Sequence, residues 1–190
     1  MMQSLKEEHK LRPTVARGAA HSSVEAACVE AVQEGRLARV RVFLRDGVAV
    51  NWQDAKGFSL LFHAIFRRHF TIAEELLAQG ANIDLADNHG WTPLFWAAFN
   101  GHTDIVGFLV AHRAAANAAT HECDRPLFMA AYKGHLEVVR VLLAGGARWD
   151  AIESGGRDAL WVARMNGHHE IVKLLETKAA APDAPLPGTH

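Results

Sequence analysis

The chain has few cysteines, almost no net charge and no long apolar run, and each absence excludes a class of protein. Only two of its 190 residues are cysteines, and they lie far apart in no CxxC spacing, so a disulfide framework and a cysteine-rich zinc site are excluded. The formal net charge is -1, so we expect no nucleic-acid partner and no binding to anionic lipid. The longest apolar run, residues 105–111, is too short to cross a bilayer.

The N-terminal segment also lacks the apolar stretch of a secretory signal. Residues 1–17 are instead rich in lysine, glutamate and arginine. The two cysteines, Cys28 and Cys123, suit a reducing compartment if they are unpaired. We therefore expect a soluble, cytoplasmic protein.

What the sequence does contain is an internal repeat. When the sequence is written in rows of 33 residues, the rows align with one another without a single insertion. A repeat of this length determines the architecture of the whole chain. Several columns keep one kind of residue in most of the rows. They are Cys28, Leu61, Leu94, Leu127 and Leu160; Ala31, Ala64, Ala97, Ala130 and Ala163; Gly35, Arg68, Gly101, Gly134 and Gly167; Phe43, Leu76, Leu109, Leu142 and Leu175; and Asn51, Asp84, Asn117 and Asp150.

Each row makes physical sense as two short helices followed by a loop. In the third row, Thr92 is a good N-cap and Pro93 suits the first helical position, where no amide donor is needed. Gly101 ends this helix, and the apolar spacing of residues 105–109 predicts a second one. Residues 81–91 are then expected to project as a hairpin-like finger.

The position after the second helix calls for a left-handed backbone conformation. Gly47, Gly80 and Gly146 supply it in three rows, whereas the third row has Arg113 there. A non-glycine residue in this conformation costs on the order of 1 kcal/mol. We therefore expect local backbone strain at Arg113.

The third row, from Asp87 to Ala98 and then Gly101–His102, resembles the ankyrin repeat pattern, with Phe95 in place of the signature histidine. The resemblance covers most of the chain and implies an all-α solenoid of helix-turn-helix units with short hairpin fingers. The expected organisation is an N-terminal arm or capping segment at 1–20, five ankyrin repeats at 21–53, 54–86, 87–119, 120–152 and 153–178, and a disordered tail at 179–190.

The column of the signature histidine is aromatic in four rows. It holds Phe62, Phe95, Phe128 and Trp161, with Val29 in the first row. One interpretation is an aromatic ladder for a ligand. The other, which we favour, is that apolar packing replaces the family's polar clasp between helix and finger.

No arrangement of residues points to a metal or to catalysis. His102, His135 and His168 share one column, and stacked helices lie about 8–10 Å apart, so the three cannot meet on one ion. Cys123 has His121 nearby but no fixed general base, and nucleotide-binding and hydrolase motifs are absent. We expect no enzyme activity, no metal and no cofactor.

The variable columns carry the functional prediction. The resemblance implies that a partner protein binds the concave face, made of the finger tips and the exposed side of each first helix. Large apolar side chains where burial is not required are the informative feature. The predicted contact residues are Phe58, His89, Trp91, Asp124 and Arg157 on the fingers, and Phe66, Arg67, Phe99, Asn100, Tyr132, Lys133 and Met165 on the helices.

Two functions remain open for this face. The first is a monomeric adaptor, inhibitor or scaffold that captures another protein there. The second is a structural role in which the same apolar patch mediates self-association. A third possibility is that these aromatic residues bind no partner, and instead pack against neighbouring fingers and shield the core.

Overall fold

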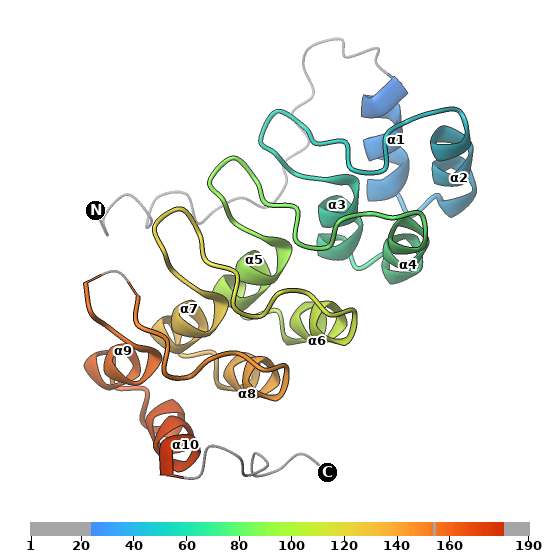
Figure 1. Cartoon of the computed structure of the whole chain (residues 1–190). Coiled ribbons are helices and arrows are strands. Elements are labelled where there is room, and N and C mark those ends of the chain that lie inside the picture. The colour runs from blue at the N-terminus through green and yellow to red at the C-terminus, as the bar shows by residue number, and fades with distance from the viewer. Residues whose placement is uncertain (1–23, 154, 181–190) are drawn as a thin grey trace.

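A computed structural model describes residues 24–153 and 155–180, and in this part of the chain it contains ten helices in five consecutive pairs (Figure 1). The all-α fold predicted from the repeat is confirmed. The helices are α1 (Val24–Gln33), α2 (Leu37–Arg45), α3 (Leu60–Phe66), α4 (Phe70–Ala78), α5 (Pro93–Asn100), α6 (Thr103–Ala111), α7 (Pro126–Lys133), α8 (Leu136–Ala144), α9 (Ala159–Met165) and α10 (His169–Ala180).

The helix pairs stack side by side into two layers. The odd-numbered helices form one layer, in which α5 packs on α7 and α7 packs on α9, and the even-numbered helices form the other. The loops between pairs project together on the side of the odd-numbered helices (Figure 1). We call these loops the fingers, and the surface that they form with the odd-numbered helices the finger face.

The core consists of the columns that the repeat conserves in kind. Leu94 and Ala97 of α5 and Ile105 and Leu109 of α6 have no exposed surface, and the equivalent residues of the second and fourth repeats are buried in the same way. In the first and last repeats the pattern is less complete, since Phe43 and Leu160 are half-buried and Arg39 is exposed. Each repeat therefore buries its apolar side chains against its own helix pair and against its neighbours, as a solenoid requires.

The predicted signals at the start of α5 are confirmed. The Thr92 hydroxyl accepts a hydrogen bond of 3.2 Å from the Phe95 amide, and Pro93 occupies the first turn. Ser59 caps α3 and Asp158 caps α9 in the same way. Gly101 follows α5 with a φ of 74°, which a glycine adopts without a steric penalty.

Three non-glycine residues of the described chain have a left-handed backbone: Arg68, Arg113 and Cys123, with φ of 60°, 63° and 67°. Each of them stands in a column where other rows have glycine. The strain predicted at Arg113 is thus present in the structure, and Arg68 and Cys123 carry the same strain.

The end of the last helix differs from the prediction. α10 continues to Ala180, so Ala179 and Ala180 are helical and the assignment of these two residues to a disordered tail is wrong. The predictions for the arm at 1–20 and for residues 181–190 lie outside the described residues.

Candidate protein-binding face

An aspartate closes the base of the finger that precedes α5. Asp87 is buried, and its Oδ1 accepts hydrogen bonds of 2.9 Å from the amides of His89 and of Trp91. Its Oδ2 accepts a hydrogen bond of 2.8 Å from the Trp96 indole nitrogen. This carboxylate therefore fixes both the path of the finger and the position of two tryptophan side chains.

The finger before α3 is built in the same way. Asp54 Oδ1 accepts from the amides of Lys56 and Phe58 at 2.8 and 3.0 Å, and its Oδ2 lies 3.0 Å from His63 Nε2. Burial raises the pKa of Asp54, but the hydrogen bonds from His63 and from the two amides outweigh it and hold the pKa below its ordinary value. The carboxylate is therefore the form that this finger stabilises.

These contacts correct our interpretation of the aromatic column. A polar clasp between helix and finger does exist in the second and third repeats, so the prediction that apolar packing replaces it there is wrong. Its donors are His63 and Trp96, one position after the expected histidine column. In the fourth and fifth repeats, a different polar contact joins neighbouring fingers: Arg125 donates to the buried Glu153 at 3.0 Å.

A stack of aromatic rings runs along α3. The rings of Phe58 and Phe62 are stacked with centroids 4.2 Å apart, and those of Phe62 and Phe66 are stacked at 4.3 Å. Trp96 of the next repeat meets Phe58 and Phe62 edge to face at 5.9 and 6.1 Å. All four residues are half-buried, so each ring supports its neighbours and also contributes to the finger face.

Trp91 is the centre of a second group in the third repeat. Its ring centroid lies 4.8 Å from Trp96, 5.0 Å from Phe95 and 5.7 Å from Phe99. The Lys133 ammonium lies 4.3 Å from the centroid of the Phe99 ring, a cation–π contact. The two aromatic groups meet at Trp96, which makes the aromatic surface continuous over two repeats.

The prediction that Phe99 lies exposed on this face is wrong. Its side chain is only 4 % exposed and packs in one cluster with Phe95 and Met129, against which Trp91 and Tyr132 also lie. Phe99 therefore belongs to the layer that supports the face. The alternative in which aromatic residues pack to shield the core applies to this residue.

The other predicted contact residues all lie on the finger face with some or much of their surface accessible. Arg67, His89, Arg157 and Met165 are exposed, and Phe58, Phe66, Trp91, Asn100, Asp124, Tyr132 and Lys133 are half-buried.

Two tryptophans that the sequence reasoning did not select also contribute. Trp96 joins the two aromatic groups, and Trp161 on α9 is 43 % exposed. The Arg157 guanidinium lies 5.0 Å from the centroid of the Trp161 ring. A signal was available, because Trp161 is the largest residue of its column.

Comparison with known proteins agrees with this architecture. A family model described as ankyrin repeats in three copies matches residues 28–120 and 113–184, which is more than half of the chain. This chain belongs to the ankyrin repeat family. A comparison with curated proteins gave no match. Ankyrin repeats are generally protein–protein interaction modules, and the family is typically non-enzymatic.

Histidines tie the ankyrin repeats to each other. The Nε2 atoms of His69, His135 and His168 lie 3.1–3.2 Å from the backbone carbonyl oxygens of residues 33, 99 and 132 in the preceding repeat. Each ring thus takes the tautomer that donates from Nε2. These side chains hold the stack together, and the described residues contain no group of three or more histidine, cysteine, aspartate or glutamate side chains that could hold a metal ion.

Charge on the finger face is mixed. Burial and the neighbouring Glu122 raise the pKa of Asp124, and burial raises the pKa of Glu153 although Arg125 opposes it. Arg67 and Arg157 are exposed cations on the same face. Among the helices of the described residues, none is long and apolar enough to span a membrane.

Proposed function

We propose that this ankyrin protein is an adaptor, inhibitor or scaffold that captures one partner protein on its finger face. The observation that carries the proposal is the aromatic surface continuous over two repeats, from Phe58 and Phe66 through Trp96 to Trp91. Half-buried aromatic rings suit this role because they are already held in place, so a partner covers them at a low cost in side-chain entropy.

The surrounding residues support the same interpretation. Aromatic residues and arginine are enriched where binding energy concentrates in interfaces, and Arg67 follows Phe66 directly in the chain. Tyr132 and Lys133 extend the surface onto α7. A partner with apolar anchor residues and some acidic side chains would complement these groups.

The proposal can be tested with a matched control in the other helix layer. Phe70 is half-buried like Phe66 and Trp91, but it stacks on Phe108 in the even-numbered layer at 4.9 Å. We expect Phe66→Ala, Trp91→Ala and Phe70→Ala to lower the free energy of unfolding by similar amounts. Each loss should be smaller than the roughly 2–5 kcal/mol typical of a fully buried leucine such as Leu109.

The three variants should differ in their affinity for the partner although their stabilities are similar. In a pull-down against the partner isolated with the intact chain, Phe66→Ala and Trp91→Ala should each lose about 2 kcal/mol or more of affinity, as central anchors do. Phe70→Ala should bind like the unmodified chain. Equal losses in all three variants, or retention of the partner by Trp91→Ala, would place the binding surface elsewhere.

A further inference from the structure

The first helix of the last repeat exposes two apolar side chains at positions that are half-buried or buried in the other repeats. Trp161 and Met165 are 43 % and 66 % exposed. In the second repeat, the residues equivalent to Trp161 and Met165 are Phe62 and Phe66, and they contact Trp96 and His102 of the following repeat, with ring centroids 6.1 Å apart in both pairs. The exposed strip formed by Trp161 and Met165 thus corresponds to the side chains with which the second repeat contacts the third.

The column positions show which residue of another repeat would lie on this strip. Trp96 is the residue that covers Phe62, and its equivalent in the first repeat is Glu30. His63, in the same column, lies 3.2 Å from Gln33, which is the equivalent of Met165. A first repeat placed after the last one would therefore bring Glu30 between the positions of Trp161 and Met165.

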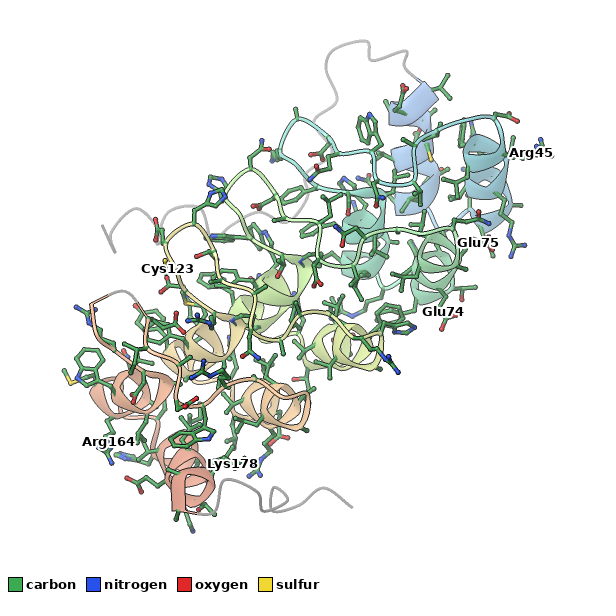
Figure 2. All side chains as sticks on the ribbon, in the orientation of Figure 1. Arg45, Glu74, Glu75, Cys123, Arg164 and Lys178 are labelled. Carbon is green, nitrogen blue, oxygen red and sulfur yellow. The ribbon has the colours of Figure 1, made fainter. Side chains whose placement is uncertain are left out.

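The two helices that would meet, α1 and α9, carry charges of opposite sign. α1 (Val24–Gln33) carries Glu25 and Glu30 and no basic residue, and Glu30 is exposed. α9 carries Arg164 and no acidic residue, and the exposed Arg157 guanidinium lies on the Trp161 ring. Figure 1 places α1 and α9 at opposite ends of the solenoid, and Figure 2 shows Arg164 at the α9 end.

We propose that a second copy of this chain occupies the strip, head to tail, with Glu30 of one copy against Arg157 and Trp161 of the next. The two surfaces are different, so the contact is heterologous and leaves a free end at each side. Copies then add in open linear chains. This surface is separate from the aromatic groups around Trp91, and the proposal does not depend on the proposed function.

A charged residue on the core side of the last repeat limits the strength of this association. Arg164 stands in the column of Ile65, Ala98 and Ala131, all fully buried, and it forms an ion pair of 2.7 Å with Glu176. The core side of the last repeat is therefore polar, which is typical of a terminal repeat. Self-association thus rests on the finger side, and we expect it to be weak and sensitive to salt.

Sedimentation velocity of the full chain over a series of concentrations tests the proposal. At low salt, the average mass should rise continuously with concentration and pass that of a dimer. Arg157→Glu and Glu30→Arg should each raise the dissociation constant at least about tenfold, because each places like charges against each other. The double variant, which exchanges the two charges, should regain association.

Arg67→Glu is the matched control, since it reverses an exposed arginine on the finger face away from the strip. It should associate like the unmodified chain. The proposal is overturned if the unmodified chain stays monomeric at hundreds of micromolar, if the mass stops at a dimer, or if the double variant does not recover. A loss caused by Arg67→Glu and not by Arg157→Glu would also overturn it, and would assign self-association to the aromatic surface.

Discussion

The guanidinium of Arg68 lies 2.8 Å from the Asp104 carboxylate, and this ion pair joins the second repeat to the third. At other junctions, the ring of a histidine such as His135 lies directly on a glycine such as Gly101. A Cβ at that glycine would come within 2.8 Å of the ring. Arg68 has a Cβ, and in the described residues His102 makes no carbonyl hydrogen bond like that of His135. The ion pair thus takes the place of a histidine–carbonyl hydrogen bond.

This relationship predicts an unusual order of stability at position 68. Arg68→Gly relieves the left-handed strain and opens the space for His102, whereas Arg68→Ala keeps both the strain and the Cβ. Both variants lose the same exposed ion pair. We expect the glycine variant to be more stable than the alanine variant by about 1 kcal/mol in urea unfolding.

Arg67 provides the control for this comparison. It ends α3 with an ordinary φ of -89°, so Arg67→Gly should be no more stable than Arg67→Ala. If alanine is equal to or better than glycine at both positions, the backbone at Arg68 is not strained.

A second prediction concerns Asp84 and Arg113. In neighbouring rows, the amide nitrogens of Asn51 and Asn117 donate to the carbonyl oxygens of Gly80 and Gly146 at 3.4 and 3.0 Å. Asp84 stands in the same column, but a carboxylate cannot donate to the carbonyl of Arg113.

The combined variant Asp84→Asn with Arg113→Gly should therefore restore the missing hydrogen bond and remove the strain. We expect a gain of about 1–2 kcal/mol in the free energy of unfolding. The hydrogen bond of 2.9 Å from the Ala115 amide to Asp84 Oδ1 should persist in the asparagine variant. A combined variant that is less stable than the unmodified chain would show that Arg113 makes a stabilising contact.

The stability of the stack should depend on pH through two histidines. Burial, followed by the Arg68 charge, lowers the pKa of His102, and burial also lowers the pKa of His135 despite its hydrogen bond to the Phe99 carbonyl. The unfolded chain, with a histidine pKa of about 6.5, then binds protons that the folded chain does not. Stability should therefore fall as pH falls through about 6.5 towards the lower folded values.

Urea unfolding at pH 7.5 and pH 5.5 measures this dependence. Replacing both histidines with glutamine, which can still donate a hydrogen bond, should reduce the difference between the two pH values. An unchanged difference would assign the pH dependence to other groups.

The two cysteines should differ in reactivity. Cys28 is fully buried, and burial together with Glu25 raises the pKa of its thiol to about 11, while Cys123 is exposed at the outer end of a finger (Figure 2). Since the thiolate is the reactive form, a thiol reagent should label one cysteine in the folded chain and both after unfolding. Cys123→Ser should abolish the labelling of the folded chain, and rapid labelling of Cys28 in that variant would contradict the structure.

Much of this fold could be predicted from the sequence because equivalent positions in successive rows have the same structural environment, so each structural signal occurs several times. Leu94, Ala97 and Leu109 recur in column with apolar equivalents, and the Thr92–Pro93 start and the Gly101 end are local signals that need no tertiary information. The strain at Arg113 also followed from its column. A single row would have supported none of these inferences with comparable force.

The residues that were wrongly predicted depend on contacts between columns. Phe99 occupies a position that its own helix pair leaves open, but Trp91 from the finger of the same repeat and Met129 from the next repeat cover it. The clasp between Asp87 and Trp96 combines two columns, and neither residue alone identifies it. Burial of this kind depends on the size of the neighbouring side chains. The period of the repeat alone does not predict which of them cover a given residue.

Site-specific photo-crosslinking tests the central claim, that partner proteins bind the finger face, most directly. A photoreactive amino acid would replace Arg67 or His89, which are exposed on the finger face, and Glu74 or Arg45, which lie on the even-numbered helices (Figure 2). Melting curves would first establish that all four variants are folded. The partner should be crosslinked from positions 67 and 89 and not from 74 and 45. Crosslinking mainly from 74 and 45 would show that the partner binds the even-numbered helices instead.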